Sequence, residues 1–340
     1  MQTSTLLSSI QFGWYTLPNR IVIVLKNCLS SAKNGIPSPN SAIKYAERTE
    51  AGLIITEPTT VFPLSEEYQN YPGIHSLEQL RAWRQITEAV HEKGGKIFLQ
   101  LWYCGSMARS HLREGKQSIL PKAIVLETET YPSEKIVLPS VSSTLTAEKI
   151  SEVVRQFRRG AQNALAAEFD GVEIYGEFGY LIDELVGNSS NQHNNNYAED
   201  VENRTQLLLA IIEAVANVWD EERVGVKVSP SHQFLGFRDP DPEGTFYYLL
   251  DALNFYNLAY VRLVEPNEAD LVVRDIPHSL VRLFRPVYRK TIMLEGKDDL
   301  EKANAFVEDG DADLVFFDNK LFVDNPDLLQ RLLGKTPTNK

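Results

Sequence analysis

The segment Ser76–Trp102 reads SLEQLRAWRQITEAVHEKGGKIFLQLW and contains one predicted helix followed by one predicted strand. Ser76 and Gln79 have the spacing of a capping box, which is typical of a helix start. Apolar side chains then recur at helical spacing, at Leu77, Leu80, Trp83, Ile86 and Val90. The pair Gly94-Gly95 predicts the end of this helix, and the mostly apolar run Lys96–Leu101 predicts a buried strand.

The same alternation of short apolar runs and amphipathic helical stretches continues along the chain. Eight runs have the character of strands: Ile21–Val24, Leu53–Thr56, Lys96–Leu101, Gly171–Ile174, Val224–Val228, Leu258–Leu263, Thr291–Leu294 and Leu314–Phe317. Eight strand-then-helix units over this length predict an α/β fold of the (β/α)8 TIM-barrel class. The alternative is an open, doubly wound sheet, but the residues after the first strand, Leu25-Lys26-Asn27-Cys28, lack the Gly-x-Gly-x-x-Gly pattern.

The connection after the third predicted strand is much longer than the others. It covers about residues 103–145 and is rich in proline, serine and charged residues. Long connections in compact domains often act as lids over a binding site. We therefore expect a single TIM-barrel domain over residues 1–340, with a lid-like insertion at the mouth of the barrel.

The composition excludes several classes of protein. The 340 residues are 43% hydrophobic and carry a net charge of −12, which does not fit a disordered or collagen-like chain. Nucleic-acid binding draws most of its non-specific affinity from lysine and arginine on phosphates, which an acidic surface disfavours, so we expect a small-molecule ligand and no nucleic-acid partner. No apolar run approaches the roughly 18–20 residues that cross a bilayer, so no membrane association is expected. With two cysteines the chain fits a reducing, cytoplasmic location, and its oligomeric state is left open.

Catalytic and binding groups of TIM barrels lie at the carboxyl ends of the strands. That rule selects these candidates: Lys26 and Asn27, Glu57–Thr60, Gln100, Trp102 and Tyr103, Tyr175–Tyr180, Lys227, Glu265, Glu295–Lys297, and Asp318–Lys320. The six histidines lack the spacing of metal ligands, so no metal site is expected. The chain also lacks the Gly-x-Ser-x-Gly motif of a nucleophilic serine.

Seven short motifs are more specific than this general pattern. They are Leu17-Pro18-Asn19-Arg20, Ala51–Glu57 (AGLIITE), Gly94–Trp102 (GGKIFLQLW), Phe169–Ile174 (FDGVEI), Ser190-Asn191-Gln192, Glu202-Asn203-Arg204 and Asn325–Leu328 (NPDL). Through these motifs the chain, from about Ile10 to Leu333, resembles the Old Yellow Enzyme family. Members of that family are FMN-dependent TIM barrels that use NAD(P)H to reduce the C=C bond of conjugated carbonyl compounds. The resemblance therefore implies this fold and these cofactors.

The resemblance also implies roles for residues near the flavin ring. Gln100 would hydrogen-bond the pyrimidine edge of FMN, and Tyr180 would protonate the substrate carbon. Lys227 stands where the family has an arginine beside the flavin, which keeps the charge but loses the bidentate geometry. Tyr175 and Phe178 replace a His or Asn pair that anchors a substrate carbonyl, so one hydrogen-bond donor remains of two.

Two further pocket positions depart from the family pattern. Asn27 lies in the first-strand segment Leu25-Lys26-Asn27, where the family has Pro-Leu-Thr or Pro-Met-Cys beside the flavin. Tyr103 begins the segment that replaces a His-x-Gly-Arg motif after the third strand. We expect Asn27 to contact the cofactor and Tyr103 to line the substrate pocket.

The resemblance places the FMN phosphate in the loops after strands seven and eight. The family has Gly-Gly and Gly-Arg there, whereas this chain has Glu295-Gly296 and Asn319-Lys320, preceded by Asp318. A carboxylate about 4 Å from one phosphate charge costs roughly 1 kcal/mol in water-like surroundings and about 4 kcal/mol at an effective dielectric near 20. Lys297 and Lys320 would offset part of this cost, so the substitutions predict that FMN binding is weakened or lost.

Two functions from different classes remain open. The favoured one is a divergent barrel without strong FMN binding, which acts on or binds a small conjugated-carbonyl-like molecule. Its role would be that of a non-redox isomerase or cyclase, a binding protein or a non-catalytic partner, with Tyr180 as general acid and Glu177 or Glu295 as base. The alternative is a functional FMN-dependent NAD(P)H ene reductase, with Tyr175 and Lys227 in place of the missing donors.

Overall fold

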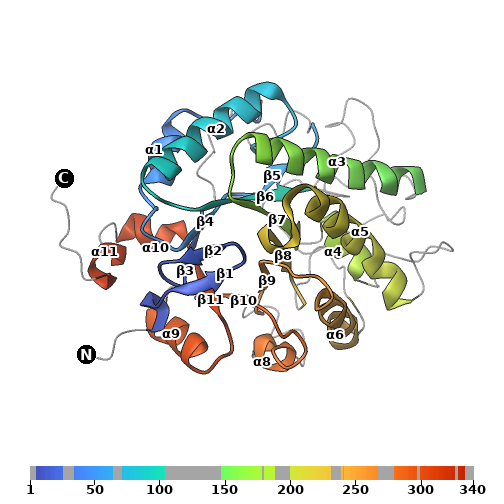
Figure 1. Ribbon diagram of the computed structural model, residues 1–340. Coiled ribbons are helices and arrows are strands. Elements are labelled where there is room, and N and C mark those ends of the chain that lie inside the picture. The colour runs from blue at the N-terminus through green and yellow to red at the C-terminus, as the bar shows by residue number, and fades with distance from the viewer. Residues whose placement is uncertain are drawn as a thin grey trace, which may run out of the picture.

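Eight parallel strands form a closed barrel in the computed structural model (Figure 1). The structure describes residues 5–25, 34–63, 71–103, 147–177, 180–187, 200–230, 239, 241–266, 279–296, 299–325 and 328–333. The barrel strands are β3 (Ile21–Val24), β4 (Leu53–Ile55), β6 (Ile97–Trp102), β7 (Gly171–Gly176), β8 (Val224–Val228), β9 (Tyr260–Leu263), β10 (Ile292–Glu295) and β11 (Leu314–Asp318). Each pairs with its neighbours, and pairing of β4 with β6 closes the ring, so the predicted TIM barrel is confirmed.

Helices surround the strands on the outside (Figure 1). They are α1 (Asn40–Ala46), α2 (Leu77–Glu92), α3 (Ala147–Ala166), α4 (Leu181–Val186), α5 (Val201–Trp219), α6 (Pro242–Leu253), α8 (Leu280–Phe284), α9 (Leu300–Glu308), α10 (Asn319–Asp324) and α11 (Leu328–Leu332). The predicted capping box at the start of α2 is present, with the Gln79 amide N–H donating to the Ser76 hydroxyl. After α2 the chain turns at Gly94, whose φ of 75° lies in the left-handed region that glycine favours.

A short hairpin that the sequence did not predict closes the amino-terminal end of the barrel. It consists of β1 (Ile10–Phe12) and β2 (Tyr15–Leu17), which pair antiparallel around a turn at Gly13. The fully buried ring of Phe12 lies 5.6 Å from the ring of Phe98 and 5.7 Å from that of Tyr260. This end of the barrel is therefore filled by apolar side chains, and a ligand of the interior has to enter from the carboxyl ends of the strands.

The predicted lid falls almost wholly outside the described residues. Tyr103 is described, and residues 104–146 are not, so the lid-like insertion stays a prediction. The single-domain organisation of residues 1–340 is likewise still a prediction. A further strand pair, β5 (Thr59–Thr60) on β6, extends the sheet at this rim. Among the described helices, none combines the length and the apolar character needed to cross a bilayer.

Candidate active site

A buried carboxylate, Glu173 on β7, organises the interior of the barrel. It accepts hydrogen bonds from Gln100 Nε2 at 2.5 Å, from Arg262 Nη2 at 3.0 Å and from the Tyr260 hydroxyl at 2.9 Å. Because successive side chains of a strand alternate between its two faces, the neighbours of Glu173 on β7 pack outward against the helices. Glu173 is completely enclosed, and a buried carboxylate persists only when such partners replace its lost hydration. The network ties β6, β7 and β9 together.

Arg262 on β9 is the second charged group of this network. Its guanidinium lies 4.6 Å from the ring centre of Phe316, and only 1% of the residue is exposed. Its Nη2 atom pairs with Glu173, whereas Nε and Nη1 have no hydrogen-bond partner among the described residues. Arg262 was not among the predicted site residues. Its one sequence signal is an arginine inside an otherwise apolar strand, which is unusual because arginine is rarely fully buried unless paired.

Lys227 and Glu177 form a buried ion pair at the carboxyl ends of β8 and β7. Their side chains are only 7% and 3% exposed. The ammonium of Lys227 also lies 4.6 Å from the ring centre of Tyr175, which is its partner in the strand register. The structure therefore brings the predicted residues Lys227 and Tyr175 together. It also pairs Lys227 with Glu177, one of the two carboxylates considered as a base.

Aromatic side chains line the same end of the barrel. The ring of Tyr180 lies 5.8 Å from that of Tyr175 and packs edge-on against Trp102 at 5.0 Å. Tyr103 is buried and stacks on Phe62 at 4.2 Å. Burial raises the pKa of the Tyr175 hydroxyl well above its ordinary value, and the neighbouring Tyr180 raises it further. Tyr175 therefore stays a neutral hydrogen-bonding group at working pH, beside the half-buried Tyr180.

The ends of β10 and β11 hold the residues predicted for the phosphate. The backbone N–H of Gly296 donates to the carbonyl of Phe316 at 2.9 Å, so this amide is already engaged. A Cβ at position 296 would lie 2.3 Å from the ring of Phe317, so the glycine is required by packing. The Asp318 carboxylate accepts from the backbone N–H of Lys320 at 3.0 Å and thereby caps α10. Lys320 itself is exposed.

Other predicted positions have a different outcome. Asn27 and Phe178, as well as Lys26 and Lys297, lie outside the described residues, so their roles stay predictions. Glu265 accepts from the backbone N–H groups of Leu280 and Val281, both at 2.8 Å, and thus holds the start of α8. In the described part of the chain, no group of three or more His, Cys, Asp or Glu side chains is arranged to hold a metal ion.

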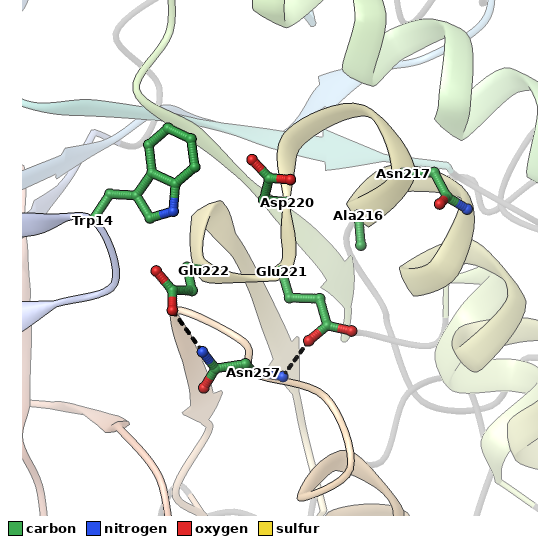
Figure 2. A pocket seen from close by; sticks show the side chains of 7 residues that line it. All are labelled: Trp14, Ala216, Asn217, Asp220, Glu221, Glu222 and Asn257. Carbon is green, nitrogen blue, oxygen red and sulfur yellow. Dashed lines mark hydrogen bonds between the residues drawn. The ribbon is translucent and has the colours of Figure 1, made fainter.

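An open acidic pocket lies at the opposite end of the barrel, where the chain enters β8 (Figure 2). Its volume is about 420 Å³, and it is lined by Trp14, Ala216, Asn217, Asp220, Glu221, Glu222 and Asn257. Figure 2 shows Glu221 and Glu222 both turned toward Asn257, whose backbone N–H and side-chain amide donate to them at 2.6 and 2.7 Å. These carboxylates hold the loop before β9 in place, remote from the carboxyl ends where the predicted site residues gather.

The comparisons with known proteins agree with this geometry. Residues 5–339 match the NADH:flavin oxidoreductase / NADH oxidase family. The chain is 34% identical to 12-oxophytodienoate reductase 1 of Oryza sativa subsp. japonica, over 98% of this chain and 87% of that protein. Its fold is similar to the old yellow enzyme from Trypanosoma cruzi, with a TM-score of 0.89, 31% identity, and coverage of 100% of this chain and 94% of the other.

Morphinone reductase in complex with tetrahydroNAD is a second solved structure of the same kind. It has a TM-score of 0.86 and 31% identity, and the match covers 98% of this chain and 92% of the other. Family match, relatives and solved structures all span nearly the whole chain, which agrees with the predicted resemblance from Ile10 to Leu333. The chain therefore belongs to the NADH:flavin oxidoreductase / NADH oxidase family and is an Old Yellow Enzyme barrel.

Proposed function

We propose that the protein is an FMN-dependent NAD(P)H ene reductase that reduces the activated C=C bond of a conjugated carbonyl compound. The observation that carries this proposal is the family match over residues 5–339. In support, Gln100 and Tyr180 lie at the carboxyl end of the barrel, where the family's chemistry takes place. None of these observations confirms the prediction that FMN binding is weakened or lost. We therefore favour the ene reductase, which was the alternative in the sequence analysis.

The interior residues fit the flat, polar ring of a flavin. The buried Arg262 has two nitrogen atoms without a partner among the described residues, and the same is true of Nε1 of Trp102. Unpartnered buried donors match the carbonyl and ring-nitrogen acceptors of such a ring. Gln100 stands beside them, bonded to Glu173 through its Nε2 atom. When bound, FMN supplies the hydride acceptor and donor that link NAD(P)H to the C=C bond.

Tyr180 is the proposed proton donor to the substrate carbon. Its ring is held between Tyr175 and Trp102, and the residue is half-buried. A phenol held at the mouth of the site is a suitable general acid, because it can transfer its proton as the substrate takes up a hydride. The packing around the ring fixes the direction from which the proton arrives.

Tyr175 is the proposed donor to the substrate carbonyl. Since its raised pKa keeps the hydroxyl protonated, it can donate to an oxygen on which negative charge develops. The ammonium of Lys227, which is paired with Glu177, packs against the Tyr175 ring and helps to hold it in position. A carbonyl held in this way is polarised for hydride attack, with one phenol in place of the two donors that the resemblance implies for the family.

Weak or absent FMN binding remains the second candidate, because two observations at the phosphate end favour it. The Asp318 carboxylate caps α10, and the amide of Gly296 is bonded within the barrel. Both features leave fewer donors for a phosphate. In that case the protein would be a non-redox isomerase or cyclase or a binding protein for the same class of conjugated carbonyl compound.

The proposal also covers the domain organisation and the cellular location of the protein. We propose one barrel domain over residues 1–340, with the insertion of about residues 103–145 above the mouth, acting in the cytoplasm on small molecules. The acidic net charge of −12 supports the absence of nucleic-acid partners.

A two-step spectroscopic experiment tests the reductase. FMN-loaded protein is mixed anaerobically with NADPH or NADH, and loss of the flavin colour is followed; a cyclic enone is then added. We expect bleaching by at least one nucleotide and return of the colour with formation of the saturated ketone. Loaded protein that neither bleaches nor reoxidises would contradict the proposed activity, whereas bleaching without reoxidation would leave a flavin reductase with another acceptor.

A further inference from the structure

Arg262 has an unusual environment for a charged side chain inside a barrel. It is 1% exposed, stacks on Phe316 and is held at one nitrogen by Glu173. Its Nε and Nη1 atoms have no partner among the described residues. A guanidinium that has lost its hydration without gaining hydrogen bonds is destabilising, and such groups occur where a ligand completes the set. Because the side chain is buried and points into the barrel, a ligand of the barrel interior can supply the missing acceptor.

The position of Arg262 is next to that of Lys227. The strand register pairs Lys227 with Arg262 across β8 and β9, and Tyr175 with Lys227 across β7 and β8. The contacts with Glu173 and Phe316 show that the guanidinium points into the barrel. The resemblance places the family's flavin-binding arginine at position 227 on β8. Arg262 lies at the paired position of the next strand, β9.

The two neighbouring cations differ in how their charge is used. Lys227 forms an ion pair with Glu177. Arg262 shares Glu173 with two other donors, Gln100 and Tyr260. Glu173 contacts the guanidinium at Nη2 only, whereas the compact ammonium of Lys227 contacts Glu177 directly. Arg262 therefore has its Nε and Nη1 atoms left as donors without a partner among the described residues, and a guanidinium stays charged at every working pH.

We propose that Arg262, and not Lys227, supplies the positive charge and the N–H donors to the pyrimidine edge of the FMN ring, with Glu173 as the residue that positions it. This inference rests on the proposed function, since it requires that FMN binds. Reduction of a flavin places negative charge on the N1 and C2-carbonyl edge, so a cation there favours the reduced ring over the oxidised one. The arginine function has then moved from β8 to β9, which also accounts for the engagement of Lys227 by Glu177.

A pair of matched variants tests the assignment in the FMN-loaded protein. Arg262→Gln and Lys227→Gln each remove one cation from adjacent strand positions. Two properties are measured besides activity: the midpoint potential of bound FMN and the dissociation constant for sulfite, whose adduct places negative charge on the same edge of the ring. We expect Arg262→Gln to weaken sulfite binding at least tenfold and to lower the midpoint potential, and Lys227→Gln to change sulfite binding less than threefold.

A third variant covers the case in which Arg262→Gln does not fold, since it leaves Glu173 without its cation. Arg262→Lys keeps the charge beside Glu173 but removes Nε and Nη1 as donors. We expect its FMN dissociation constant to rise about tenfold while its sulfite affinity stays within threefold of the unmodified protein. An FMN dissociation constant equal to that of the unmodified protein would overturn the proposal.

The outcomes separate the two levels of inference. If the unmodified protein binds FMN and Lys227→Gln has the larger effect on potential and sulfite, or if both variants leave them unchanged, the role of Arg262 is wrong while the proposed function stands. If the unmodified protein binds no FMN at all, both are wrong.

Discussion

The barrel interior has a lower half, at the amino-terminal ends of the strands, and an upper half, at their carboxyl ends. The two halves are built from the same strands but are stabilised by different interactions. In the lower half, the ring of Phe12 from the β1–β2 hairpin packs against the rings of Phe98 and Tyr260. In the upper half, Glu173 holds Arg262 and Gln100 in place, and Glu177 holds Lys227, through charges and hydrogen bonds. The lower half closes the barrel by apolar packing, whereas the upper half keeps polar groups ready for a ligand.

Tyr260 lies at the border between the lower and upper halves. Its ring belongs to the apolar cluster around Phe12, while its hydroxyl donates to Glu173 at 2.9 Å. Burial, followed by the nearby Glu173 carboxylate, raises the pKa of this hydroxyl well above its ordinary value, so it remains a neutral donor. Tyr260 therefore belongs to both halves. We expect variants of the lower half to change stability alone, and variants of the upper half to change FMN binding as well.

The largest expected effect is on the upper half, from Glu173→Gln. Removing the carboxylate leaves the buried Arg262 without its counter-charge, and breaking a buried pair in this way costs about 3–5 kcal/mol of unfolding free energy. Urea unfolding of FMN-free protein measures it. The control is Glu88→Gln on the surface of α2, where the carboxylate pairs with Arg84 and is 53% exposed, and where a change of less than about 1 kcal/mol is expected. A loss below about 1 kcal/mol for Glu173→Gln would show that the network does not support the fold.

The corresponding change in the lower half is Phe12→Ala. Deleting a buried aromatic ring costs about 3 kcal/mol, near the low end for such changes, because the hairpin can partly collapse into the space. Its FMN dissociation constant should stay within twofold of the unmodified protein, as the ring is separated from the upper half by Tyr260. Urea unfolding and FMN titration give the two values. If FMN affinity fell more than tenfold, the two halves would not be separable.

Tyr180→Phe tests the chemistry of the rim without affecting either half of the interior. Loss of a general acid reduces turnover of a cyclic enone about 100-fold, while anaerobic reduction of the flavin by NAD(P)H stays unchanged. Stopped-flow measurement of the two half-reactions distinguishes these steps. Tyr256→Phe, which removes a hydroxyl bonded to Glu213 on the outer surface, is the matched control and should leave both rates unaltered. Equal loss in both half-reactions would contradict the role of Tyr180 as proton donor.

The smallest expected effect lies below the apolar layer, at Asp170. Burial alone would raise the pKa of Asp170, but hydrogen bonds from His91 and Lys96 more than offset this and lower it. A carboxyl with a lowered pKa in the folded state stabilises the protein above its unfolded pKa of about 3.9, and that contribution is lost as the pH falls through the folded value. Asp170→Asn should therefore cost about 1–2 kcal/mol at pH 7, with the difference vanishing in acid.

Urea unfolding from pH 7 down to pH 3 checks this. The control is Asp309→Asn, whose carboxylate is 58% exposed in a surface pair with Arg282 and should contribute less than about 0.5 kcal/mol. A penalty for Asp170→Asn that grows as the pH falls would have the wrong sign for this account.

The sequence was a good guide to the barrel wall. The eight predicted strands are present, and the ends of Ile21–Val24 and Val224–Val228 agree with the structure. Short, almost wholly apolar runs carry this information locally, and so does the capping box at Ser76. The hairpin Ile10–Leu17 was missed because its three-residue strands are too short to show an alternating pattern.

The site was less predictable, because its meaning depends on pairing between distant strands. Lys227 and Glu177 were both candidates, yet only the structure shows that they form an ion pair with each other. Gln100 was assigned to the flavin, whereas its side chain also bonds Glu173, 73 residues away. Arg262 was missed entirely, since a single arginine in a strand does not reveal whether it faces a helix or the barrel interior.

The FMN content of the purified protein decides whether the barrel is a flavin site. The upper half of the barrel keeps charged and polar groups in place for a flavin ring. Purified protein should therefore be yellow, release about one FMN per chain on denaturation, and rebind FMN stoichiometrically when the flavin-free form is titrated. Colourless protein that fails to take up FMN at millimolar concentration would contradict this assignment. It would favour the non-redox role that the acidic residues Asp318 and Glu295 suggest.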